Sequence, residues 1–150
     1  MTTITEMQTT QVYNVFIKAT PEAVWDAITQ PEFTQQYFYG TRSQYDLRPG
    51  GRFLSLAGDD STMVDGEVVE ADPPTKLVHT WRAHFDAGMA EEAYSRVTWE
   101  IEAGDDGVSK LTVVHDKLEG APKTAESVAG GWEYVLSGLK TLLETGKPLS

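Results

Sequence analysis

The stretch Glu126–Gly146, "ESVAGGWEYVLSGLKTLLETG", decides the fold, because it has the pattern of a long closing helix. Its apolar residues recur at intervals of three and four, which gathers them into one stripe of an amphipathic helix. The stripe consists of Val128, Trp132, Val135, Leu136, Leu139, Leu142 and Leu143. We expect one helix over residues 123–145, with this stripe packed on the core of the protein.

Glycines interrupt this predicted helix. Gly131 and Gly138 lie seven residues apart on one flank, and each glycine inside a helix costs roughly 1 kcal/mol relative to alanine. The smooth flank either packs closely against the rest of the molecule or leaves space beside large aromatic side chains. In the second case, a Gly138→Leu substitution would fill part of the space and weaken the uptake of an apolar probe.

Ahead of the closing helix, the chain starts with a strand and then turns helical. The segment "VYNVFIKA" is rich in β-branched and aromatic residues, which predicts a strand. In "TPEAVWDAITQPEF", Thr20 suits the N-cap of a helix and Pro21 its first turn. Pro31 ends that helix, and we expect a second short helix over residues 31–37.

Between Thr41 and Asp116 the pattern changes to short alternating segments separated by turn signals such as "RPGGR", "GDDS" and "GDDG". The strands are expected near residues 42–47, 52–57, 62–71, 76–85, 94–103 and 109–118. Strands joined by short turns are antiparallel neighbours, so this order favours an α+β fold over a parallel one. We expect one domain over residues 11–148, behind a flexible leader of residues 1–10.

The last three strands form a meander with one apolar face and one polar face. The tight "GDDG" turn predicts that Trp99 pairs with Val113. A register that also sets Trp81 opposite Trp99 would place three large side chains in one rank. In that register His79 and His115 lie toward opposite ends of the inner face. Their separation would exceed about 10 Å, which is too far for a shared metal ion.

Composition limits the classes of function. The chain has 150 residues and a net charge of −11 without a Lys/Arg cluster, which disfavours nucleic acids and acidic membranes as partners. It has no cysteine, no apolar run long enough for a membrane span and no signal-peptide pattern, so we expect a cytoplasmic protein. No phosphate-loop, dinucleotide or metalloprotease motif is present, so no cofactor and no metal site are predicted.

Five segments in a fixed order carry a resemblance to a known family. They are "TPEAVWDAITQPE", "DLRPGGRF", "DGEVVEADPPTKLVHTW", "SRVTWEIEAGDDGVSKLTVVH" and "GGWEYVLSGLKTLLE". The chain resembles the SRPBCC superfamily of START-like, helix-grip proteins, in the branch named for the activator of the ninety-kilodalton heat-shock protein ATPase. The resemblance implies about six or seven antiparallel strands wrapped around the C-terminal helix, and a mostly apolar cavity between them. Many members carry a tryptophan where this chain has Tyr37.

We therefore predict a protein that binds a small hydrophobic molecule in this cavity. The residues expected to enclose it are Tyr37, Phe38, Phe53, Trp81, Ala83, Phe85, Val97, Trp99, Val113, His115, Trp132, Val135 and Leu139. His115 and Tyr37 are the polar groups expected to orient the ligand. Alternatively, His115 is a core histidine whose hydrogen bonds are satisfied within the protein. Phe38, Tyr39 and the loop over residues 86–93 are expected to control access.

Two other functions stay open from the sequence. A cyclase-like or dehydratase-like enzyme would need two polar groups converging inside the cavity, and no catalytic residue is assigned. A co-chaperone or regulatory domain would bind its partner through the outer surface and would have its interior filled by side chains. A homodimer is also left open.

Overall fold

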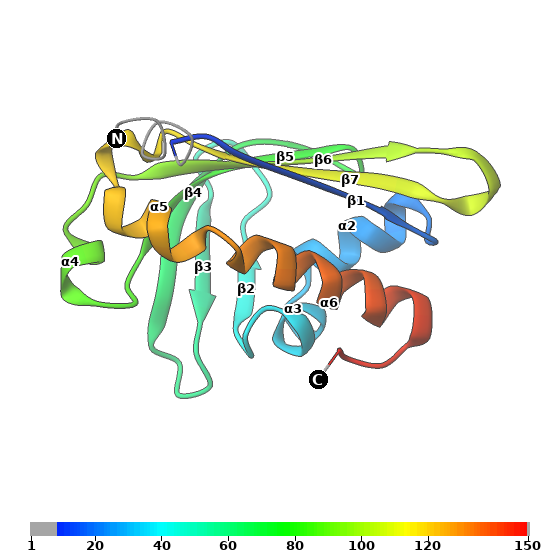
Figure 1. The fold of residues 1–150 in the computed structure, drawn as a ribbon, viewed down its shortest axis with the longest axis horizontal. Coiled ribbons are helices and arrows are strands. Elements are labelled where there is room, and N and C mark those ends of the chain that lie inside the picture. Colours follow the sequence, from blue (N-terminus) through cyan, green and yellow to red (C-terminus); the bar gives the residue numbers. More distant parts are fainter. Residues whose placement is uncertain (1–8, 150) are drawn as a thin grey trace.

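The computed structural model describes residues 9–149. Of the predicted leader, therefore, only Thr9 and Thr10 lie within the described residues. Figure 1 shows a curved sheet with the closing helices running across its inner side. No helix in residues 9–149 is long and apolar enough to cross a membrane.

The strands lie close to the predicted ranges. They are β1 (Gln11–Ile17), β2 (Arg42–Tyr45), β3 (Arg52–Leu56), β4 (Thr62–Asp72), β5 (Lys76–Ala83), β6 (Ser95–Ala103) and β7 (Ser109–Asp116). The helices are α2 (Pro21–Thr29), α3 (Pro31–Tyr37), α4 (Ala87–Ala90), α5 (Pro122–Val128) and α6 (Gly131–Thr145). Short 3-10 turns, η1 (Asp105–Gly107) and η2 (Leu118–Gly120), flank β7. The Thr20 side chain caps α2 by accepting a hydrogen bond from the backbone N–H of Ala23, as its position predicts.

All seven strands form one antiparallel sheet in the order β1-β7-β6-β5-β4-β3-β2. The predicted α+β, helix-grip architecture is thereby confirmed. The register of the β6–β7 hairpin is also confirmed, because Trp99 pairs with Val113 and Val97 with His115. The tight turn at Gly104–Gly107 leaves no freedom for another register.

The predicted pairing of Trp81 with Trp99 is wrong. Trp81 pairs with Ser95, and Trp99 pairs with Leu77. The shift is an even number of residues, so both indoles stay on the inner face and are buried. The connection from β5 to β6 contains α4, and such a long connection does not set the register as a tight turn does.

The same shift corrects the expected placement of the two inner histidines. His79 pairs with Val97, and Val97 pairs with His115. The histidines therefore lie in one rank across three strands, and not at opposite ends of the face. Strands are about 4.8 Å apart, so two strand spacings, or about 10 Å, separate their backbones.

The sheet bends sharply where β4 meets β5. A Cβ atom at Gly66 would lie 2.0 Å from the carbonyl oxygen of Thr80, so only glycine allows this close backbone approach. The β4–β5 register then shifts between Val68 and Glu70. Irregular pairing of this kind increases strand bending, and it turns β4, β3 and β2 around the inner helices (Figure 1).

The closing segment is two helices, and the single helix expected over residues 123–145 is wrong. Ala129 is extended, and Gly130 adopts φ +83°, a left-handed conformation that favours glycine. The break turns the chain between α5 and α6. The apolar stripe nevertheless faces the core as predicted, since Val128, Trp132 and Leu139 are all buried.

Gly138 and Gly131 do not break the helix as Gly130 does, and their surroundings differ from each other. At Gly138 an added Cβ would lie 3.1 Å from Cβ of Tyr37, so α6 packs tightly on α3 there. Gly138 therefore does not border the largely apolar pocket described below, and Gly138→Leu is not a pocket-filling change. At Gly131 the nearest side-chain atom is the hydroxyl of Tyr39 at 3.6 Å, which is an ordinary contact.

Candidate functional site

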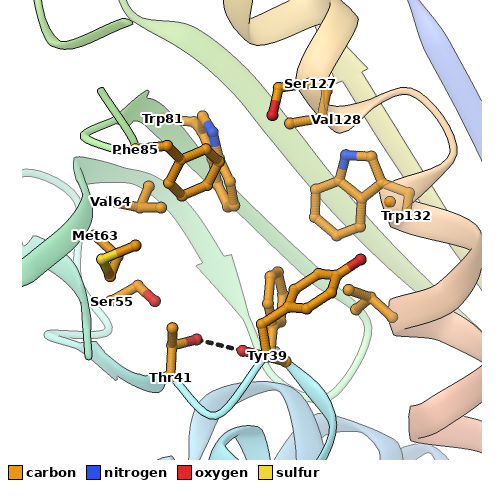
Figure 2. A pocket seen from close by; sticks show the side chains of 13 residues that line it. Tyr39, Thr41, Ser55, Met63, Val64, Trp81, Phe85, Ser127, Val128 and Trp132 are labelled. Carbon is orange, nitrogen blue, oxygen red and sulfur yellow. Dashed lines mark hydrogen bonds between the residues drawn. The ribbon is translucent and has the colours of Figure 1, made fainter. Parts of the chain in front are cut away.

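A pocket of about 310 Å³ lies between the bent half of the sheet and the junction of α5 with α6. Figure 2 shows Trp81 and Phe85 on one side of it, with Trp132 on the other. The lining residues are Phe38, Tyr39, Thr41, Ser55, Met63, Val64, Trp81, Phe85, Ser127, Val128, Gly131, Trp132 and Val135. Aromatic and aliphatic side chains form most of this wall.

The structure divides the thirteen residues expected to enclose a ligand into two groups. Five of them line the pocket: Phe38, Trp81, Phe85, Trp132 and Val135. The other eight are buried in the packing behind it: Tyr37, Phe53, Ala83, Val97, Trp99, Val113, His115 and Leu139. Side chains from the sheet and α6 fill the centre of the molecule, so the open volume lies near the break between the helices. Ligand contact stays a prediction for the first group.

Sequence reasoning did not assign several lining residues to the cavity wall. Tyr39 was expected only to control access, and Val128 was assigned only to the apolar stripe. Met63 and Val64 lie on β4, where no inner face was assigned, although the alternation of Val64 and Val68 with the acidic Asp65 and Glu67 would have pointed to Val64. Thr41, Ser55 and Ser127 are small polar residues, which carry no distinctive sequence signal.

Trp132 is the aromatic centre of the wall. Its ring centroid lies 5.7 Å from that of Phe38, 5.7 Å from that of Trp81 and 5.4 Å from that of Trp99. The contacts with Phe38 and Trp99 are edge-to-face, a favourable geometry for aromatic pairs. The helix α6 is thus joined to β5 and β6 through a continuous aromatic cluster.

His115 uses both ring nitrogens within the protein. Its Nδ1 accepts a hydrogen bond from Nε1 of Trp132 at 3.0 Å, and its Nε2 lies 2.8 Å from Oγ of Ser95. Because Nδ1 is an acceptor, the proton of the neutral ring is on Nε2, which donates to Ser95. Burial, followed by the nearby His79, lowers the pKa of His115 to about 3. His115 is therefore a neutral core histidine that does not border the pocket.

His79 repeats this arrangement two strands away in the same rank. Its Nε2 accepts from Nε1 of Trp99 at 3.1 Å, and its Nδ1 lies 3.0 Å from the backbone carbonyl oxygen of Thr80. The tryptophan again assigns the tautomer, with the proton on Nδ1. Burial lowers the pKa of His79 to about 4. Neither histidine is free to exchange a proton with a ligand at neutral pH.

Tyr37 is also committed to the core. Its hydroxyl donates to the backbone carbonyl of Ala27 at 2.7 Å, which ties α3 to α2. Complete burial raises the pKa of this phenol well above its ordinary value. The tyrosine that replaces the tryptophan of many relatives therefore joins two helices and does not present its hydroxyl to the pocket.

Trp81 differs from its aromatic neighbours. Among the described side chains, its Nε1 is the one buried nitrogen or oxygen atom without a hydrogen-bond partner. Its backbone carbonyl, in contrast, accepts from Oγ of Ser95 at 3.2 Å. A buried N–H left without an acceptor costs about 1–3 kcal/mol, so this donor calls for an explanation.

The polar groups of the wall are uncharged. Tyr39, Thr41, Ser55 and Ser127 supply hydroxyl groups, and no acidic or basic side chain lines the described wall. The hydroxyl of Thr41 donates to the backbone carbonyl of Phe38 at 2.6 Å (Figure 2). Within residues 9–149, no group of three or more histidine, aspartate or glutamate side chains is placed to hold a metal ion.

On the outer face, Asp65 anchors the chain that leads to Phe85. It accepts hydrogen bonds from Tyr94 at 2.6 Å and Arg82 at 3.2 Å, and it pairs with Nε2 of His84 at 2.7 Å. Burial alone would raise the pKa of Asp65, but these partners lower it overall. The cluster holds both ends of the segment between β5 and β6, within which Phe85 lies.

A seven-stranded antiparallel sheet closed by C-terminal helices is the helix-grip fold of the SRPBCC, or START-like, class of proteins. The chain belongs to the family described as "Activator of Hsp90 ATPase homolog 1-like protein", whose family model matches residues 18–144. The search of curated proteins found no match.

Solved structures agree with this assignment. Protein MLL2253 from Mesorhizobium loti is 25% identical, with a TM-score of 0.73 over 90% of this chain and 96% of that protein. PFC0360w, an HSP90 activator from Plasmodium falciparum, is 23% identical, with a TM-score of 0.73 over 93% and 98% of the two chains. CalU16 from Micromonospora echinospora is 22% identical, with a TM-score of 0.71 over 93% and 76%. The last two likenesses concern the fold.

Proposed function

We propose that this protein binds a small, uncharged and mainly apolar molecule in the pocket beside Trp81 and Trp132. The observation that carries the proposal is a partly open volume of about 310 Å³ that borders the hydrophobic core and has a mainly apolar wall. Protein cores normally eliminate such space, and ligand pockets begin at about 300 Å³. The volume therefore suits a compound of one or two rings better than a long lipid.

The character of the wall supports an uncharged ligand. A charged group moved into this pocket would lose its hydration without meeting a side chain of opposite charge among the described lining residues. The net charge of −11 also repels anions at long range. Aromatic surfaces from the sheet and from α6 instead offer dispersion contacts on two sides of a flat molecule.

The two alternative functions lead to different expectations. An enzyme would need converging acid–base groups, whereas His79, His115 and Tyr37 already use their polar atoms in the core. A regulatory domain of the kind that the family description suggests would act through its surface, and a filled interior would suit it better. Recovery of a protein partner without any small-molecule binding would favour that second function.

The test is a titration with 2-isopropenylnaphthalene, an apolar two-ring probe, combined with native mass spectrometry of freshly purified protein. Ser127→Trp places a large side chain at the rim of the pocket, whereas Ser137→Trp makes the same change on an exposed part of α6 away from it. Binding that falls at least tenfold in the first variant and is unchanged in the second is the expected result. Absence of binding to the unmodified protein would overturn the proposal.

A further inference from the structure

We propose that the pocket selects molecules with an uncharged hydrogen-bond acceptor, such as a ketone, ester or ether oxygen, which accepts the indole N–H of Trp81. This inference rests on the proposed function and adds the chemical class of the ligand. It assigns to Trp81 the role of a specificity-determining residue.

The comparison among three neighbouring indoles carries the inference. Trp99 donates to His79 and Trp132 donates to His115, so each of these buried N–H groups has an acceptor in the core. Trp81 is 3% exposed and borders the same aromatic cluster, yet its N–H has none. A phenylalanine at this position would keep an aromatic wall and avoid the unpaired donor. The indole thus provides a donor that the fold itself does not use.

The polar groups of His115 and Ser95, which lie beside Trp81, are already hydrogen-bonded to other partners. The nearest ring nitrogens belong to His115, whose centroid lies 5.5 Å from that of Trp81, and both are already hydrogen-bonded. The hydroxyl of Ser95 donates to the carbonyl of Trp81 and accepts from His115. Trp81 lines the pocket, and its Nε1 is buried without a partner, so we assign the acceptor to the contents of the pocket.

The acceptor must be neutral. One N–H and a few hydroxyls would have to stabilise a buried carboxylate or phosphate, and the described wall carries no cationic side chain to help them. A ketone or ether oxygen needs only one or two donors, which Trp81 and a nearby hydroxyl of Ser127 or Ser55 supply. The apolar remainder of the ligand then occupies the aromatic part of the pocket.

Phe85 decides how the acceptor reaches this donor. It lies on the Trp81 side of the pocket in Figure 2, and it is 44% exposed although Trp81 is not. It follows β5 by two residues, so it lies beyond the last strand pairing and the sheet does not fix its side chain. Rotation of Phe85 toward solvent opens the wall beside Trp81 without disturbing the sheet.

The experiment compares 2-acetylnaphthalene with 2-isopropenylnaphthalene, which differ only in a C=O or C=CH2 group. In the unmodified protein we expect the ketone to bind about three- to tenfold more tightly, the range for one net hydrogen bond. Trp81→Phe should remove this preference and leave the hydrocarbon affinity within about twofold. Trp25→Phe, which removes an indole on α2 outside the pocket, is the matched control and should keep the preference.

A second measurement covers the case in which Trp81→Phe does not fold. In the unmodified protein, the indole N–H proton resonance of Trp81 should move downfield with the ketone and much less with the hydrocarbon. Equal binding of both probes and an unmoved Trp81 resonance would overturn the inference while the proposed function stands. If neither probe binds, both proposals fail together.

Discussion

The indole nitrogen of Trp132 lies 3.0 Å from Nδ1 of His115, so one hydrogen bond joins α6 to the inner face of β7. The bond links the two layers of the fold at the wall of the pocket. It also sets the tautomer of His115, which in turn donates to Ser95 on β6. Helix position, histidine protonation and sheet geometry are therefore coupled through a single buried contact.

This coupling is testable by a double-mutant cycle. We expect His115→Leu to lower the free energy of unfolding by about 1–3 kcal/mol, because it leaves the N–H of Trp132 without an acceptor. Trp132→Phe should be destabilising as well, but the double variant should lose less than the sum of the two. Urea denaturation measures all four states of the cycle, and strictly additive losses would contradict the coupling.

The two buried histidines predict an acid-sensitive fold. Burial lowers the pKa of His79 to about 4 and that of His115 to about 3, whereas an unfolded histidine titrates near about 6.5. Between these values the unfolded chain binds protons that the folded chain excludes, so stability falls as the pH falls. The stabilisation is fully present above about pH 6.5, and the steepest loss is about 1.4 kcal/mol per pH unit for each histidine.

Urea unfolding at pH 7, 6, 5 and 4 measures this slope, and a His79→Leu variant that still folds should show a smaller one. Histidine ring-proton resonances followed by NMR give an independent check. If the His79 and His115 signals titrated between about pH 6 and 7, as exposed imidazoles do, the buried neutral assignment would be wrong.

Alanine substitutions at the adjacent glycines Gly130 and Gly131 should have different effects on the stability of the protein. Gly130 has φ +83°, where a side chain costs about 1–2 kcal/mol, so Gly130→Ala should lower the melting temperature. Gly131 begins α6 with only an ordinary contact at 3.6 Å, so Gly131→Ala should leave stability unchanged or raise it slightly. Thermal unfolding followed by circular dichroism compares the two variants. An equal loss of melting temperature in both would show that the left-handed conformation of Gly130 is not the cause of the destabilisation.

The cluster around Asp65 predicts that an outer-face residue affects the pocket. Asp65→Ala should cost about 1–2 kcal/mol, because Tyr94, Arg82 and His84 lose a shared acceptor. The segment that carries Phe85 should then exchange its amide protons faster. Glu126→Ala, an exposed acid on α5, serves as the control. Unchanged hydrogen exchange over residues 84–94 would contradict this role.

Much of the fold could be predicted because its signals are local. Alternation along β6 and β7 assigns Trp99 and Val113 to the inner face, and the short turn at Gly104–Gly107 sets their register. The capping signal at Thr20 likewise acts within one helical turn. Such features depend on neighbouring residues, so the sequence carries them without knowledge of the rest of the chain.

The candidate site could be predicted only in part, because many inward positions compete for the same space. Trp99 and Trp132 have the same sequence character, yet the first is buried behind the pocket and the second lines it. Which of them faces open volume depends on the bend of the sheet at Gly66 and on the turn of the chain at Gly130. Neither bend can be derived from periodicity.

The amino-acid pattern alone therefore determined which side of each strand and of the closing segment faces inward, since side-chain direction follows from backbone period. Tertiary packing decided the rest: that Gly138 is a tight contact with Tyr37, that His79 and His115 share one rank, and that the Trp81 N–H remains without a partner. The reason is that hydrogen-bond partners and unfilled volume depend on how distant segments fit together, and that fit exists only in three dimensions.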